Sequence, residues 1–392
     1  MKRKLIVALF AIFFILSGLS ASDWRFFVDG IDQHPQILIG FLPTYVSGGV
    51  GYKGLSLLED DTTEFTLRAG AGYIERRFWN NPKTGEEEKE MNPLTFDVLQ
   101  VDWGLEFSQG FLDSPAGDKD LITLSVGYEG KYEKFYDSMV AGKKNKDAWG
   151  TPQPVQTRAQ FFEGASDWTK YYPDLAGNGQ YLGTNLYFNF FLDAMEDTLA
   201  TNDGYTIEFN ADWSPYALNA ALDGKADFYQ FTLEGVGAKT LYQYKTEKMN
   251  WFSIVVIDRL RVNWLSGDEV PTYARKAGSL GRQVRGYRNY TYGTEFYVVN
   301  NFDVRFTGPD MGVDGLNVRV NLFFDFGYGC GKYFNTDFKG SNFLASTGAQ
   351  FTVSIFDFID LGYQLAYLIG EGRNFANGDT PLVGSFTFFL DF

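Results

Sequence analysis

Residues 205–213 read YTIEFNADW, and apolar and polar side chains alternate along the whole stretch. One set consists of Tyr, Ile, Phe, Ala and Trp, and the other consists of Thr, Glu, Asn and Asp. Successive side chains of a β-strand point to opposite faces, so the alternation predicts a strand with one apolar and one polar face. Such a strand fits between lipid on one side and a polar interior on the other.

The same alternation recurs over much of the chain, for example in residues 101–108, 122–129, 186–192 and 318–326. These segments run to about ten residues, which is the length that a tilted strand needs to cross a bilayer. A soluble antiparallel sandwich with one solvated face would also alternate. The polar face has few lysines and the apolar positions are rich in aromatic residues at strand ends, so we favour the membrane barrel.

The fold class predicted from this pattern is all-β: a transmembrane antiparallel β-barrel of about 16 strands, occupying residues 37–392. An even number of strands is expected for a single-chain bacterial barrel. The weakest of the predicted strands is the sixth. The strands are predicted at residues 37–46, 46–58, 63–79, 94–111, 120–136, 155–164, 181–194, 203–215, 228–243, 251–264, 280–292, 293–307, 316–329, 344–355, 360–371 and 382–392.

The start of the chain is typical of a secreted protein. Three basic residues at positions 2–4 precede an apolar run at 5–16, and small residues follow. This layout predicts a cleavable signal peptide over residues 1–22, because the apolar run is short for an anchoring transmembrane helix. Residues 23–36 would form a short periplasmic leader. We therefore expect the protein in a bacterial outer membrane.

The composition agrees with a barrel. Aromatic residues make up 18% of the chain and there are 43 glycines, yet the mean hydropathy is only −0.21. After the signal, the sequence contains no run of 18 apolar residues, which is the length that a membrane-spanning helix would need. Removing the three basic residues of the signal takes the net charge from −15 to −18, which disfavours nucleic acid as a partner.

Few residues are suited to catalysis or metal binding. The chain has one cysteine, Cys330, and one histidine, His34, in the predicted leader. An internal disulfide, a cysteine-based zinc site and a histidine metal cluster are therefore excluded. The GVGYKG sequence at 49–54 matches a dinucleotide-binding pattern but lacks the strand–helix context that this pattern needs. We expect no enzymatic activity and no cofactor.

A basic segment at residues 265–295 differs from the rest of the chain, because five cations fall within fourteen positions. The inward positions of the predicted strands are acidic. Since ion pairs away from bulk water are poorly screened, this segment should fold into the interior. A basic loop exposed to solvent is the alternative. The cations are Arg275, Lys276, Arg282, Arg285 and Arg288, and the inward acids are Asp102, Glu106, Glu129, Glu208, Asp212, Glu234, Asp303 and Asp325.

Four motifs make the assignment more specific. Val284-Arg285-Gly286-Tyr287 is followed by NFDVRF at 301–306, FFDFG at 323–327 and a terminal strand at 385–392 that ends in Phe. This set resembles the V-R-G-F/Y loop, the acidic-x-R-F strand, the F-x-D-x-G strand and the C-terminal strand of the BamA/TamA outer-membrane assembly and translocation superfamily, also called the bacterial surface antigen family. Five strands follow the motif loop in that family, and five predicted strands follow Arg285 here.

The resemblance implies a sixteen-stranded barrel whose motif loop re-enters the interior. It places Arg285 against Asp325 and Asp303, and strand parity also puts both acids on the inner face. It further implies that the last strand is a targeting signal. The residues implied for the loop motif are Val284, Arg285, Gly286 and Tyr287, and those for the targeting strand are Phe386, Phe388, Leu390 and Phe392.

One departure concerns the POTRA domains, which in most members precede the barrel and receive client proteins. About fourteen residues separate the predicted signal from the first strand, so we expect a POTRA-less member. The resemblance implies a role in outer-membrane protein or lipid insertion or translocation. The expected partners are outer-membrane lipid, and unfolded outer-membrane strands or a separate periplasmic subunit. A passive cation-preferring channel and a structural or adhesive surface antigen are the alternatives.

Overall fold

A computed structural model describes most of the residues that the sequence assigns to strands. The described strands form one sheet in which each long strand pairs antiparallel with the next along the chain. The described residues are 36–42, 45–55, 62–78, 94–114, 120–136, 179–197, 202–245, 251–271, 274, 280–287, 294–308, 316–331, 343–355, 359–369 and 381–390.

The hydrogen-bonded order contains fourteen strands, and a two-residue strand, β7, pairs only with β8. The fourteen strands of this order differ in length, from seven residues in β1 to twenty in β4. Their bounds are β1 Gln36–Leu42, β2 Tyr45–Leu55, β3 Thr63–Phe78, β4 Leu94–Asp113, β5 Asp120–Tyr136, β6 Gln180–Asp193, β7 Glu196–Asp197, β8 Asn202–Ser214, β9 Asp227–Lys245, β10 Trp251–Glu269, β11 Phe296–Thr307, β12 Leu316–Cys330, β13 Phe343–Ile355, β14 Ile359–Ile369 and β15 Leu382–Leu390.

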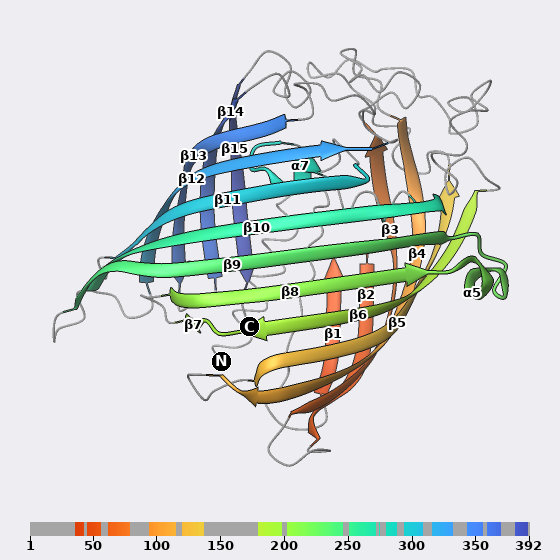
Figure 1. Ribbon diagram of the computed structural model, residues 1–392. Helices are drawn as coiled ribbons and strands as arrows, with labels where there is room; N and C mark the ends of the chain where they lie inside the picture. The colour runs from red at the N-terminus through yellow and green to blue at the C-terminus, as the bar shows by residue number, and fades with distance from the viewer. Residues whose placement is uncertain are drawn as a thin grey trace, which may run out of the picture.

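The alternation of apolar and polar residues in the sequence corresponds to an alternation of buried and exposed side chains along the strands. In β12, Phe323 and Asp325 are almost fully buried, whereas Phe324 between them is 45% exposed. Figure 1 shows the sheet curving round, so that β8, β9 and β10 lie in front and β1, β2, β14 and β15 lie behind them. The buried residues therefore line the inner face of the curve, and the large exposed apolar residues cover its outer face. The prediction of an all-β antiparallel fold is confirmed.

Two of the sixteen predicted strands need comment. The strand predicted at 155–164 lies outside the described residues. The strand predicted at 280–292 is wrong over its described part, because residues Leu280–Gln283 form a short helix, α7, and a turn follows to residue 287. Gly286 in this turn has φ +90°, which interrupts an extended backbone. The segment also has strand neighbours on neither side within the described pairing.

The antiparallel order places connections alternately at the two ends of the sheet. Those over residues 79–93, 137–179 and 270–295 share one end, whereas the connections at the other end are at most eight residues long. Outer-membrane barrels have long extracellular loops and short periplasmic turns. We therefore expect the end with the long connections to be extracellular, with β1 beginning and β15 ending on the periplasmic side. No helix in the described part of the chain is long and apolar enough to cross a membrane.

The connection between β8 and β9 is organised around one buried amide. A five-residue helix, α5 (Tyr216–Ala220), carries Asn219, which is fully buried. Its Oδ1 accepts hydrogen bonds from the backbone N–H and the hydroxyl of Thr184, and its Nδ2 donates to the Ser214 hydroxyl and to the Ala226 carbonyl. One side chain thus ties β6 to both ends of this connection, which satisfies polar groups that burial would otherwise leave unpaired.

Candidate functional site

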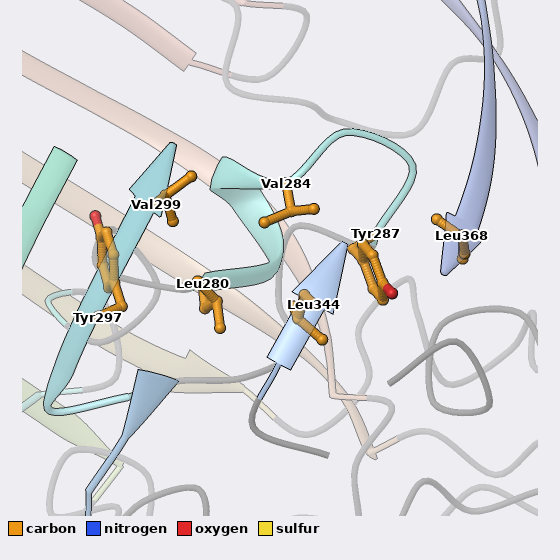
Figure 2. Packing of buried hydrophobic residues seen from close by; sticks show 7 residues of the cluster. All are labelled: Leu280, Val284, Tyr287, Tyr297, Val299, Leu344 and Leu368. Atoms are coloured by element: carbon orange, nitrogen blue, oxygen red, sulfur yellow. The ribbon is translucent and has the colours of Figure 1, made fainter. Parts of the chain in front are cut away.

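The segment over residues 280–287 lies against the inner face of the sheet, beside β11 and β12. Its apolar side chains, Leu280, Val284 and Tyr287, are all buried. They pack with residues from three strands, as Figure 2 shows. Burial of this cluster fixes the segment to the wall of the sheet. The strand residues in the cluster are Tyr297, Val299, Leu344 and Leu368, with Val383 packed against it.

Gly286 is required by both backbone conformation and space. Its φ of +90° lies in the region that residues with a Cβ rarely adopt. A Cβ added here would lie 2.7 Å from Cβ of Ala366 and 2.8 Å from Cδ2 of Leu368. The next residue, Tyr287, donates its hydroxyl to the carbonyls of Ala345 and Ile369, at 3.3 and 3.4 Å. The turn therefore touches strands that lie far later in the chain.

Arg285 projects from this turn onto two inward carboxylates. Its Nε and Nη2 donate to Oδ2 and Oδ1 of Asp325 at 2.8 and 2.6 Å, and its backbone N–H also donates to Oδ2 at 2.8 Å. Its Nη1 and Nη2 donate to Oδ1 and Oδ2 of Asp303 at 2.7 and 3.0 Å. One planar guanidinium thus holds two carboxylates, and both contacts use two nitrogens, which is the strong geometry for such pairs.

The side chains of Arg285, Asp303 and Asp325, which together form an ion triad, are largely buried. Asp325 is fully buried, and the side chains of Arg285 and Asp303 are 20% and 15% exposed. The guanidinium carbon also lies 4.0 Å from the ring centre of Phe323, as in a cation–π contact. Burial by itself lowers the pKa of Arg285, but the hydrogen bonds to Asp325 and Asp303 outweigh this and raise its pKa above the ordinary value. The arginine is therefore a fixed cation.

Further hydrogen bonds hold the helix that precedes the turn. Nη1 of Arg261 in β10 donates to Oε1 of Gln283 at 3.0 Å, and Nδ2 of Asn301 in β11 donates to the Gln283 carbonyl at 3.0 Å. Arg261 also pairs with Glu234 of β9 at 3.1 Å. Hydrogen bonds and ion pairs thus link the segment to earlier strands, β9 and β10, as well as to later strands up to β14.

The remaining predicted inward acids have other partners. Glu129 is 3.4 Å from Arg68, Glu106 accepts a hydrogen bond from Tyr187, and Asp212 accepts a hydrogen bond from Asn185. These groups come from β3 to β8, away from the helix and turn. The other three acids accept hydrogen bonds or pair as follows: Asp102 with Gln100, Glu208 with Asn189 and Asn210, and Glu234 with Arg259 and Arg261.

The predicted targeting strand is only partly described. Phe386 is 84% exposed on the outer face and its ring lies 5.0 Å from that of Tyr363. Phe388 and Leu390 lie in β15, but their side chains are outside the described ones, and Phe392 lies outside the described residues altogether. The cations Arg275, Lys276 and Arg288 are also outside them.

Sequence reasoning missed three features of this site. Phe323 stands in a run of three apolar residues, which hides its inward position, although strict parity with Asp325 would have revealed it. The helical spacing of Leu280 and Val284, four residues apart, was the available signal for α7. Gln283 has no signal in the sequence, because its partners belong to other strands.

The comparison with protein families now decides the assignment. Residues 98–355 match the Omp85 superfamily domain, which covers about two thirds of the chain. The chain belongs to the Omp85 superfamily. It is thus an outer-membrane β-barrel protein, as expected from the resemblance. The match extends well before residue 280, where the sequence motifs alone gave only a barrel pattern.

One solved structure supports the fold of this Omp85 protein. A BamA from Haemophilus ducreyi lacking POTRA domains 1–3 matches over 91% of this chain, with a TM-score of 0.50 and 9% identity. This chain spans 65% of the length of that BamA chain. A bacterial polysaccharide outer membrane secretin matches over 89% of the chain and 91% of its own, at 8% identity and a TM-score of 0.35, which is too low to inform the fold. No curated protein matches the sequence.

Proposed function

We propose that this Omp85 protein inserts protein or lipid into the outer membrane, or translocates protein or lipid across it. The observation that carries the proposal is Arg285, held by Asp303 and Asp325 on the inner face of an Omp85 sheet. Arg285 donates five hydrogen bonds to the two aspartates, and an apolar cluster packs the whole segment against the sheet. Its contribution is mechanical, because it braces the strands that lead to one end of the sheet.

The two ends of the sheet are the proposed working parts. Over the residues that the structure describes, β1 has seven residues and β15 has nine, whereas β9 and β10 have nineteen each. Within the described ranges, no pairing joins β1 to β15. β2 also carries Gly48, Gly49 and Gly51, and glycine weakens a strand interior. A seam between short, weak strands can open and offer unpaired backbone groups to a partner strand.

The partners of this activity follow from the same chemistry. An incoming unfolded outer-membrane strand would add to a free strand edge by backbone hydrogen bonds, which tolerate many sequences. Outer-membrane lipid would meet the opened seam. We further propose that a separate periplasmic subunit delivers the client to the barrel.

The proposal can be tested with the purified barrel in vesicles. An unfolded eight-stranded barrel protein is added as the client, and its folding is followed by heat-modifiable mobility on gels. Vesicles that contain this protein should fold the client faster than empty vesicles. A second protein carries one cysteine in β1 and one in β15, with Cys330 replaced by serine. Oxidation should abolish the acceleration and a reductant should restore it.

A control must separate the seam from disulfides in general. Phe324 in β12 and Thr347 in β13 face each other in the register, so a cysteine pair there joins two strands that are already paired. Oxidising that pair should leave client folding unchanged. Equal folding in empty and loaded vesicles would contradict the proposal. A large, steady, cation-selective current in planar bilayers would instead support a passive channel.

A further inference from the structure

Asp258 is a carboxylate on the outer, lipid-facing side of the sheet. It lies in β10 with its side chain exposed, on the same face as Leu260 and Trp264, which are about half exposed. The neighbouring residue Arg259 faces inward and pairs with Glu234. Asp258 is thus separated from the polar interior by the wall of the sheet.

The aromatic residues on this face fix the depth of Asp258. Phe252 packs with Tyr242 at one end of the band, and Trp264 packs with Tyr229 and Phe231 at the other. The twelve residue steps from Phe252 to Trp264 span about 40 Å of strand, or roughly 30 Å of height at a barrel tilt, which is close to the apolar thickness of an outer membrane. Asp258 stands halfway between them, near the bilayer midplane.

The carboxylate has one partner from its own chain in the described structure. Nδ2 of Asn300 in β11 donates to its Oδ1 at 2.7 Å. Asn300 also faces lipid, since its neighbours Tyr297 and Val299 alternate inward and are buried. Lipid tails offer no hydrogen-bond donor, so the other lone pairs of Asp258 would stay unsatisfied in pure lipid.

The surrounding face is hollowed as well as charged. Gly235 and Gly237 in β9 face outward next to Leu260 and Asp258, and a Cβ at either position would meet nothing within 4 Å. A shallow outer hollow of about 440 Å³ adjoins them, where Leu233 and Val262 are part of the lining. Small residues in a membrane let another segment approach the backbone closely.

The charges select the occupant of this face. On the same face, Lys239 lies two residues from Gly237, the neighbour of Asp258, and pairs with Asp203 at 2.6 Å. These two charges cancel, so the described outer face of β8–β11 between the aromatic residues keeps a net charge of −1, from Asp258. Two copies meeting here would bring two such faces together, which is unfavourable. We infer that this surface docks a membrane-embedded segment of another protein that presents a lysine or arginine to Asp258. The site lies opposite the two ends of the sheet and does not depend on the seam (Figure 1).

The test uses the folded protein in phosphatidylcholine vesicles with two synthetic probes. One is a polyleucine transmembrane helix with a central lysine, and the other has leucine at that position. Energy transfer from the outer face of the protein to a labelled peptide measures binding. The lysine peptide should bind the wild type at least about tenfold more tightly than the leucine peptide. Asp258→Leu should remove this preference.

Two further variants keep the result interpretable. Asp258→Asn is close to isosteric and should also lose the preference, which guards against a folding defect in Asp258→Leu. Asp268→Leu changes an exposed acid of the same strand beyond Trp264 and should retain the preference. Equal binding of both peptides to the wild type, or a preference that survives Asp258→Leu, would overturn the inference. So would competition by phosphatidylethanolamine, or energy transfer between labelled copies that needs Asp258, because these assign the face to a lipid amine or to a second copy.

Discussion

The inner face of the sheet is acidic in two regions that treat their carboxylates differently. In β11–β14, which we term the braced strands, Asp303 and Asp325 share one arginine that comes from outside the sheet. In β3–β8, which we term the open strands, Glu129 lies 3.4 Å from Arg68. Asp212 in the same region accepts a hydrogen bond from the neutral amide of Asn185. Asp325 is fully buried, whereas the Glu129 side chain is 37% exposed. The same residue types are therefore held by one shared arginine in the first region and by separate, weaker partners in the second.

The most severe test of this contrast removes the shared cation. Arg285→Ala leaves two carboxylates facing each other in a dry site, so we expect a loss of about 3–5 kcal/mol in the free energy of unfolding. Urea denaturation of the barrel in vesicles measures this loss. The double variant Arg285→Ala with Asp325→Ala should be more stable than Arg285→Ala alone, since the most buried charge is gone. Strictly additive losses would contradict the brace.

A smaller loss should follow when the turn is changed without touching a charge. Gly286→Ala forces a Cβ into a positive-φ position and against Ala366 and Leu368. We expect about 2–4 kcal/mol, from backbone strain and overpacking together. Protease sensitivity of the turn should rise in parallel. The matched control is Gly237→Ala, because a Cβ there meets open space. Equal losses in the two variants would mean that the turn is not packed as described.

A third comparison asks whether the open strands have the register that the structure gives them. Phe209 packs on the outer face with Phe188 and Phe231, whereas the adjacent Glu208 accepts hydrogen bonds inside from Asn189 and Asn210. Phe209→Arg should cost about 2–3 kcal/mol, because a charge then faces lipid away from the interface. Glu208→Gln should cost less than about 1 kcal/mol, since it keeps hydrogen-bonding capacity. Similar costs would contradict the register.

The smallest effect is expected at the ion pair of the open strands. Arg68 and Glu129 lie 3.4 Å apart, and both side chains are more than a third exposed. Such pairs contribute at most about 1 kcal/mol, and less at high salt. Arg68→Met should therefore change the urea midpoint only slightly. A loss as large as that of Arg285→Ala would erase the distinction between the two regions.

The contrast also explains what the sequence could and could not predict. The strand at 203–215 was predicted within a residue of β8, because alternation is a local property. The inward positions of Asp303 and Asp325 follow from the same alternation. The strand predicted at 280–292 was wrong because the conformation of residues 280–287 depends on strands that come later in the chain. No local pattern reports that Tyr287 packs between β13 and β14.

The reach of the turn has a consequence for the order of folding. Arg285 contacts Asp303, 18 residues later, and Asp325, 40 residues later, while Tyr287 contacts Ile369, 82 residues later. Contacts of such sequence separation form slowly, since the intervening chain must first be ordered. Full docking of the turn therefore requires β11 to β14 to be in place. A chain truncated before β14 should lack the contacts of Tyr287 with Ile369 and Leu368, and limited proteolysis of the turn would detect their loss.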